Sequence, residues 1–179
     1  RDSLADIHAL LFWLRPQNIN KIKRDYENSK LRQGLGIIFH ITPSNMPINF
    51  FYSYLFGLLS GNINIVRVPS KNFTQTVFLM NILDKVLHSP KFEDIKNMSN
   101  FISYEKDDQI TENLSKICNC RVIWGGDKTV DLIRRVYLPA KSREITFCDK
   151  FSLSIINLNE ISNIKKKSME TLVKNFFTD

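Results

Sequence analysis

The sequence predicts an α/β fold, an open parallel sheet with helices on both faces. Short runs rich in β-branched and apolar residues alternate with longer segments of helical periodicity, which is typical of right-handed βαβ units. The 6 glycines fall into close pairs, and each pair adjoins a predicted strand. The length of 179 residues, with 43% hydrophobic and 24% charged residues, is that of one globular domain.

The first part of the chain lies outside this alternation. Asp2–Leu14 is predicted to be a helix, and the polar stretch Gln17–Gln33 is predicted to link it to the first strand. We therefore expect a leading helix and linker over residues 1–33 and a main domain over residues 34–179.

The first half of the main domain contains two predicted strands and two predicted helices. Leu35–Ile41 is nearly continuously apolar, as expected for a strand that is covered on both faces. Ile48–Ser60 is too long for one strand and apolar almost all round, which predicts a buried helix. Ile63–Val68 is the next predicted strand, and apolar residues at helical spacing predict an amphipathic helix over Thr74–His88.

The second half continues the alternation. Its predicted strands are Phe101–Tyr104, Arg121–Trp124, Glu144–Phe147 and, as a further candidate, Ser152–Asn157. Its predicted helices are Asp107–Ile117, Asp127–Val136 and a last helix from about Asn159 to Phe177. Strands separated by helices of this length indicate right-handed βαβ units that build one parallel sheet.

Cysteine usage and hydropathy bear on the compartment. The 3 cysteines are an odd number, and a single residue separates Cys118 from Cys120, so a reducing, cytoplasmic setting fits better than a disulfide framework. The longest apolar run, Ile48–Leu59, falls short of the roughly 20 residues of a membrane span, and no secretory signal opens the chain. Because the chain begins with Arg1 in a predicted helix, we expect it to be part of a longer protein.

The charge favours an anionic partner without indicating nucleic acid. The net charge is +7 and the sequence pI is about 9.4. The basic residues are scattered, and the one tight run, Lys165–Lys167, is predicted to be a solvated helix face. A basic stripe interleaved with aromatic residues is not seen, nor is a zinc module, so neither nucleic-acid binding nor a metal site is expected.

Three loops follow predicted strands, where open parallel sheets bind their ligands. They are Thr42–Pro47, Arg67–Lys71 and Gly125–Thr129. Neither the G-x-G-x-x-G fingerprint nor a P-loop is present. Gly125 and Gly126 lie between a strand and a helix, so their backbone either approaches a phosphate or nicotinamide closely or forms a plain tight turn.

Two nearby side chains are assigned to packing. His40 lies in the middle of an apolar strand and is predicted to be a core histidine with satisfied hydrogen bonds. Trp124 is predicted to pack rather than to stack on a ligand.

Several of these motifs together resemble a known family. The stretches GLGIIFHITPSNMPINFF, LSGNINIVRVPS and VIWGGDKTV resemble, in order and spacing, the cofactor-binding part of the aldehyde dehydrogenase superfamily. RVIWGGDKTVDLIRR and LPAKSREITFCDKFSLSII are most similar to acyl-CoA reductases of the bioluminescence fatty-acid reductase type. The resemblance covers about Gln33 to Ile156 and implies a Rossmann-like NAD(P)-binding domain over residues 34–179.

The resemblance implies a role for individual residues. Asn45 matches the amide that hydrogen-bonds the oxyanion of the thioester reaction, although in this sequence alone it could simply shape a turn between prolines. Thr42 and Pro43 are placed at the cofactor, as are Gly125 and Gly126.

The cofactor is expected to be NADPH, with NADH as the alternative. Arg67 stands where the family has a lysine at the adenosine ribose, and Ser70 stands where NAD-preferring members have a glutamate. Arg67 and Ser70, with Lys71 nearby, would favour a 2′-phosphate that a carboxylate would repel. The alternative is that Arg67 and Lys71 are ordinary surface cations.

Departures from the family pattern define the expected reaction. The segment that carries the general-base glutamate of hydrolytic aldehyde dehydrogenases is matched by Glu144–Lys150, with the glutamate displaced, as in an enzyme where coenzyme A replaces water. None of the cysteines lies at the family's nucleophile position, and Cys118, Cys120 and Cys148 are all predicted to be small core residues. The resemblance places the catalytic-cysteine domain beyond residue 179, so this chain alone is expected to be inactive.

The resemblance therefore implies the nucleotide-binding part of an acyl-CoA reductase that forms a fatty aldehyde from an acyl-CoA or other acyl thioester. In the intact protein, a homo-oligomer or a complex with an acyl-activating enzyme is a further expectation. The alternatives are an NAD(P)-dependent aldehyde dehydrogenase and a non-catalytic Rossmann-like binding module.

Overall fold

The computed structural model describes residues 5–26, 32–105, 107–151, 153–157, 159, 161 and 164–178. The chain divides into two compact units, residues 1–149 and 150–179, each described by itself below. The elements of the first unit are α1 (Ala5–Trp13), α2 (Pro16–Tyr26), β1 (Ile37–Ile41), α3 (Asn49–Leu59), β2 (Ile63–Arg67), α4 (Thr74–Leu87), the 3₁₀ turn η1 (Pro90–Phe92), α5 (Glu93–Asn97), β3 (Ser99–Ile102), α6 (Asp108–Ile117), β4 (Cys120–Trp124), α7 (Asp127–Arg134) and β5 (Arg143–Phe147). The second unit contains α9 (Lys166–Thr178).

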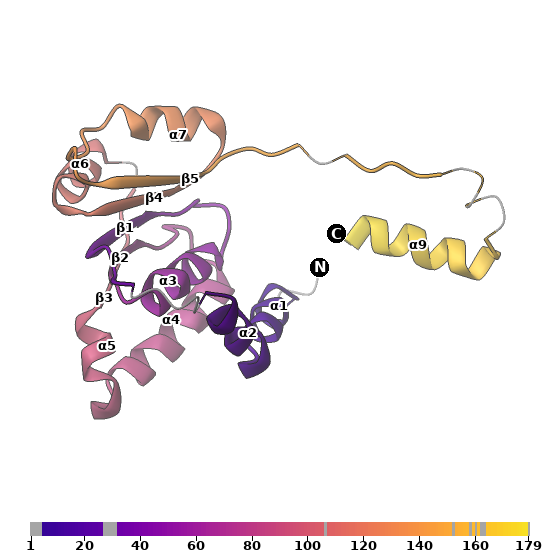
Figure 1. Ribbon diagram of the computed structural model, residues 1–179, viewed down its shortest axis with the longest axis horizontal. Coiled ribbons are helices and arrows are strands. Elements are labelled where there is room, and N and C mark those ends of the chain that lie inside the picture. Colours follow the sequence, from indigo (N-terminus) through magenta and orange to yellow (C-terminus); the bar gives the residue numbers. More distant parts are fainter. Residues whose placement is uncertain are drawn as a thin grey trace. The chain divides into compact units, whose positions relative to one another are not determined.

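The strands form one five-stranded parallel sheet in the order β3-β2-β1-β4-β5 (Figure 1). The chain runs outward from β1 to β2 and β3, then returns to the other side of β1 for β4 and β5. The direction of winding therefore reverses between β1 and β4. This is a doubly wound α/β sheet, and the predicted fold class is confirmed.

Helices cover the two faces of the sheet separately. In Figure 1, α3 and α4 lie on one face and α6 and α7 on the other. Because strand residues alternate in direction, Phe39 and Ile41 pack with Val130 of α7, whereas Val66 packs with Phe50 of α3. Both faces thus have their own apolar core, which explains why the strands read as nearly continuous apolar runs.

The helix that follows β3 begins at a side-chain cap. Asp107 is the N-cap of α6, and its Oδ1 accepts hydrogen bonds from the backbone N–H groups of Gln109 (2.8 Å) and Ile110 (3.1 Å). This carboxylate satisfies donors that the first helical turn leaves free, and it fixes the start of α6 at the end of the sheet.

The first part of the chain contains more helix than predicted. The predicted helix corresponds to α1, with its residues 2–4 outside the described part, and the predicted linker contains α2. Helix α2 has no fully buried residue, and its polar sequence offers only two aliphatic residues, Ile19 and Ile22, which are half-buried. Its signal is Pro16 at the first helical position.

Two other predictions are corrected. Strand β3 is Ser99–Ile102, and Tyr104 lies beyond its end. The strand predicted over Ser152–Asn157 is wrong: Ser152 lies outside the described residues, and residues 153–157 form no strand. Leu153 and Ile155 are exposed there, because an apolar run becomes a strand only where a neighbouring strand pairs with it. Within the described residues, no helix is long and apolar enough to cross a membrane.

Candidate active site at the carboxyl edge of the sheet

The three loops singled out in the sequence begin at neighbouring positions on one edge of the sheet. They follow β1, β2 and β4, and β1 is hydrogen-bonded between the other two strands. Ile41 at the end of β1 pairs with Ile123 of β4. On the other side, Thr42 Oγ1 donates a 2.6 Å hydrogen bond to the backbone carbonyl of Arg67, which ties the first two loops together.

The predicted oxyanion residue lies in the first of these loops. Asn45 is in a turn between Pro43 and Pro47, and its side chain is exposed. Ser70 and Lys71 are also exposed, in the segment between β2 and α4. These side chains are thus accessible to a ligand at the carboxyl edge, while Thr42 is buried and serves to hold the loop.

Arg67 is held in place by an aromatic residue that the sequence did not single out. Its guanidinium carbon lies 4.6 Å from the centre of the Tyr104 ring, and Nη2 donates to the Tyr104 carbonyl at 3.3 Å. The Tyr104 hydroxyl lies 3.2 Å from Thr111 Oγ1 on α6. Burial raises the pKa of Tyr104, so the phenol stays neutral beneath the guanidinium.

A cavity of about 720 Å³ opens beside Arg67, between α6 and α7. It lies at the carboxyl ends of the strands where the winding reverses, which is the usual ligand position in such sheets. Its lining residues are Ile41, Ser44, Arg67, Asp107, Asp108, Thr111, Glu112, Thr129, Leu132, Ile133, Arg135, Val136 and Tyr137. Of the predicted site residues Arg67 lines this cavity, and Ser44 and Thr129 come from the other two loops.

The glycine turn after β4 leads directly into α7. Gly125 N–H donates to the Phe147 carbonyl at 3.1 Å, and Gly126 is the N-cap residue of α7. A Cβ at Gly126 would lie 3.0 Å from Asp149 Oδ2, so a side chain there would crowd this carboxylate. The Asp149 carboxylate therefore occupies the space in front of Gly126, and the close approach of a phosphate or nicotinamide to this backbone stays a prediction.

A carboxylate already lies at the start of α7. Asp149 Oδ2 accepts from the Asp127 N–H at 3.1 Å, and the Asp149 N–H donates to Asp127 Oδ1 at 3.3 Å. The positive end of the helix dipole favours such an anion. The same N–H groups are of the kind that bind phosphate oxygens in nucleotide-binding folds.

The displaced glutamate has a structural role. Arg121 is 1% exposed, and its Nε donates to Glu144 Oε2 at 2.9 Å. Glu144 Oε1 accepts from Arg134 Nε, also at 2.9 Å. Both carboxylate oxygens of Glu144 thus accept hydrogen bonds from arginines. Glu144 is therefore not free to act as a general base.

The cysteines differ from one another. Cys118 and Cys120 are buried, as predicted, and burial raises the pKa of the Cys118 thiol to about 11. The prediction that Cys148 packs in the core is wrong, because its side chain is exposed. Strand β5 lies at the edge of the sheet and ends at Phe147, so Cys148 follows the last paired residue.

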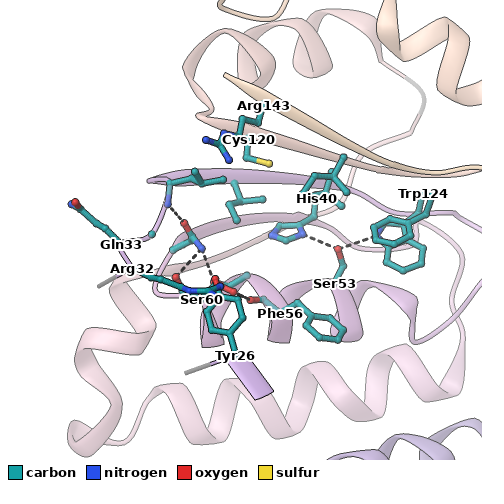
Figure 2. A pocket seen from close by; sticks show the side chains of 18 residues that line it. Tyr26, Arg32, Gln33, His40, Ser53, Phe56, Ser60, Cys120, Trp124 and Arg143 are labelled. Carbon is teal, nitrogen blue, oxygen red and sulfur yellow. Dashed lines mark hydrogen bonds between the residues drawn. The ribbon is translucent and has the colours of Figure 1, made fainter. Parts of the chain in front are cut away.

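A second cavity, of about 480 Å³, lies on the α3 face of the sheet (Figure 2). None of the predicted site residues lines it. His40 and Trp124 do, and both contact Ser53. His40 is a buried histidine with hydrogen bonds at both ring nitrogens, and Trp124 stacks on Phe147 with ring centres 3.8 Å apart, as the packing predictions required.

Sequence reasoning missed Tyr104 and Asp149. Tyr104 follows β3, so it lies in a fourth post-strand segment, outside the three loops named above. Asp149 follows β5, so the same topological rule points to it.

Comparisons with known proteins identify a matching family and a solved structure with a similar fold. A family model described as acyl-CoA reductase (LuxC) matches residues 14–174. Among solved structures, the chain is similar to glyceraldehyde-3-phosphate dehydrogenase GapN from Methanocaldococcus jannaschii DSM 2661, a structure complexed with NADP, with 19% sequence identity and a TM-score of 0.52. The match covers 65% of this chain and 25% of that one, so the chain spans about a quarter of that protein's length. A search of curated proteins found no match.

Proposed function

The chain belongs to the acyl-CoA reductase (LuxC) family, and from that membership we propose that it is the nucleotide-binding part of an NADPH-dependent acyl-CoA reductase. The whole enzyme would form a fatty aldehyde from an acyl thioester, through a thioester on a cysteine outside this chain. One observation carries the proposal: the loops that the family resemblance assigns to the oxyanion and to the cofactor follow neighbouring strands β1, β2 and β4.

The residues present fit a nicotinamide nucleotide. The cavity between α6 and α7 has room for an adenosine, with Arg67 fixed at its side by Tyr104. The pyrophosphate would bind at the start of α7, where its oxygens would displace the Asp149 carboxylate from the Asp127 N–H. Bound there, the nucleotide supplies the hydride that reduces the acyl group.

Asn45 would act on the substrate rather than on the nucleotide. Its exposed amide lies in the loop after the central strand. An amide N–H can stabilise the negative charge that develops on the acyl oxygen without changing its own protonation state. Thr42 supports this loop through its bond to the Arg67 carbonyl.

Glu144 favours this reaction over the oxidative alternative. An aldehyde dehydrogenase that releases an acid needs a carboxylate base to activate water. Glu144 is instead engaged by Arg121 and Arg134. A non-catalytic binding module would have the same fold, but it would not show the fall in kcat that we expect for Asn45→Ala below.

The proposal extends to the whole protein. Residues 34–179 form its NAD(P)-binding domain, and a further domain supplies the catalytic cysteine. We place the enzyme in the cytoplasm, where the three cysteines of this chain stay reduced. A homo-oligomer, or a complex with the enzyme that activates the acyl group, would deliver the thioester.

Arg67→Glu is expected to reverse the nucleotide preference. Arg67 carries a fixed positive charge beside the proposed adenosine site, and a charged hydrogen bond to a 2′-phosphate is worth about 1.5–3 kcal/mol. The unaltered chain should therefore bind NADPH at least about tenfold more tightly than NADH in calorimetry. Arg24→Glu makes the same charge change on α2, at a residue that does not line the cavity beside Arg67, and should leave the ratio unchanged. Equal affinities in the unaltered chain would contradict the assignment of Arg67.

Asn45→Ala tests the reaction itself in the whole enzyme. The oxyanion exists only after the nucleophile attacks, so losing one donor should lower kcat about 100-fold with little change in NADPH affinity. Acyl-CoA-dependent oxidation of NADPH measures the first quantity, and calorimetry measures the second. Met46→Ala is the neighbouring control, because Met46 is exposed in the same loop and is not among the residues that line the cavity beside Arg67. A folded Asn45→Ala enzyme with unchanged turnover would remove Asn45 from the site.

A further inference from the structure

A chain of hydrogen bonds, buried at Asn64 and His40 and partly buried at Trp124, ends at the residue before the glycine turn. It runs from Asn64 on β2 to His40 on β1, then to Ser53 on α3 and Trp124 on β4. Figure 2 shows its last part, where His40, Ser53 and Trp124 converge along one side of the 480 Å³ cavity. These hydrogen bonds join β2, β1 and α3 to the end of β4.

The orientations of the Asn62 and Asn64 side-chain amides determine which atom donates in each of these bonds. Asn62 Oδ1 accepts the backbone N–H of Leu35 at 2.6 Å, so its Nδ2 faces the Gly57 carbonyl at 3.1 Å. The carbonyl of Asn62 accepts from Asn64 Nδ2 at 2.7 Å. Asn64 therefore presents Oδ1, an acceptor only, to His40 Nε2 at 3.0 Å.

These partners fix the tautomer of His40. Nε2 must carry the proton, because Asn64 Oδ1 cannot donate one. Nδ1 is then an acceptor, and the Ser53 hydroxyl donates its hydrogen bond to it, with Oγ and Nδ1 2.8 Å apart. Ser53 Oγ in turn accepts from Trp124 Nε1 at 3.0 Å. Each donor in the chain thus has one acceptor, and burial lowers the pKa of His40 to about 4, which keeps the ring neutral near pH 7.

The packing around this chain is close. His40 is 1% exposed, Asn64 0% and Ser53 4%. Gly57 lets α3 lie directly against the first two, since a Cβ there would collide with Asn64 Oδ1. Losing a hydrogen-bond partner would leave a buried donor or acceptor unsatisfied, which is energetically costly, and this cost stabilises the observed geometry.

Trp124 transmits this constraint to the turn. It is the last residue of β4, and its indole stacks on Phe147 with an interplanar angle of 11°. The N–H of Gly125 donates to the carbonyl of Phe147. The hydrogen bond to Ser53 and the stack on Phe147 together leave the indole one orientation.

We propose that Ser53 and His40 are positioning residues for the nucleotide: they hold Trp124 by its indole N–H and thereby fix the Gly125–Gly126 turn that the nucleotide approaches. This inference rests on the proposed function of the turn. It assigns a role in cofactor affinity to a buried serine and histidine on the face of the sheet opposite the adenosine cavity.

The test changes one partner of the Ser53–Trp124 bond at a time in the full 179-residue chain. Ser53→Ala removes the acceptor of the indole N–H and also the hydroxyl that donates to His40 Nδ1, while Trp124→Phe keeps a ring to stack on Phe147 and removes only the indole donor. Ser53→Thr restores a hydroxyl. Ser60→Ala is the matched control, because the Ser60 hydroxyl bonds only to the Phe56 carbonyl among the hydrogen bonds described for it.

Two readouts are measured. NADPH affinity should fall about three- to tenfold in Ser53→Ala and in Trp124→Phe, as expected for loss of one hydrogen bond, and no further in the double variant. Hydrogen exchange of the Trp124 indole N–H, assigned by NMR with Trp13→Phe, should quicken at least tenfold in Ser53→Ala. Ser53→Thr should recover both, and Ser60→Ala should change neither.

The outcomes separate this inference from the function it rests on. If the unaltered chain binds NADPH but Ser53→Ala binds it equally well, the positioning role is wrong and the proposed function stands. Multiplying effects of Ser53→Ala and Trp124→Phe would also overturn it, because the two residues would then act independently. If the unaltered chain does not bind NADPH, the proposed function fails, and the positioning role fails with it.

Discussion

Glu144→Gln is expected to lower the free energy of unfolding by about 3–5 kcal/mol, because it leaves a buried guanidinium without its counter-charge. Arg121 is 1% exposed in the middle of β4, and Glu144 on β5 is 18% exposed beside it. The remaining Arg121 donors go to Ser115 Oγ and to the Val136 carbonyl, which are neutral. Urea unfolding followed by circular dichroism measures the loss.

The same substitution elsewhere provides the control. Glu112 pairs with Lys116 at 2.7 Å on α6, but both side chains are more than 40% exposed. Glu112→Gln should therefore cost less than about 0.5 kcal/mol. Replacing both buried partners, with Arg121→Met and Glu144→Leu, should recover most of the loss. A Glu144→Gln protein within about 1 kcal/mol of the unaltered chain would show that the pair does not hold β4 to β5.

The fold followed from the sequence wherever burial on both sides imposed a pattern. Strand β1 lies at the centre of the sheet, so its residues are apolar on both faces and were easily recognised. Helix α2 escaped because none of its residues is fully buried. The strand predicted over Ser152–Asn157 failed for the opposite reason, since its apolar residues lack a pairing neighbour in the described structure and stay exposed.

The site was predictable as a set of loops but not as a set of contacts. The rule that ligands bind at the carboxyl ends of strands located Asn45, Arg67 and Gly126 on one edge. It could not show that Tyr104 lies under Arg67, because that contact depends on where β3 ends. Nor could it show that Asp149 reaches the start of α7, which depends on the pairing of β5 with β4.

His40 shows what the sequence could and could not give. An apolar strand predicted a satisfied core histidine, and the structure confirms it. The partners come from β2 and α3, at sequence separations of 24 and 13 residues, so their identity required the fold. Burial lowers the pKa of His40 from 6.5 to about 4, against the hydrogen bond to Asn64, which raises it, so the ring stays neutral in the folded protein at pH values well below 6.5.

This lowered pKa predicts a loss of stability in mild acid. In the unfolded chain His40 takes up a proton near pH 6.5, whereas in the folded protein it does so only near pH 4. Between these values the unfolded state binds more protons, so the free energy of unfolding falls as the pH falls, by about 1.4 kcal/mol per pH unit and by about 3 kcal/mol in all. Above pH 6.5 this contribution is complete and constant.

His40→Gln isolates this contribution from that of every other group. The variant is less stable than the unaltered chain at pH 7, because Ser53 loses its ring acceptor, but the gap should narrow by about 3 kcal/mol between pH 6.5 and pH 4. Urea unfolding at half-unit steps of pH gives each curve. A gap between His40→Gln and the unaltered chain that stays constant over this range would mean that His40 is protonated equally in both states, and the neutral buried ring would then be wrong.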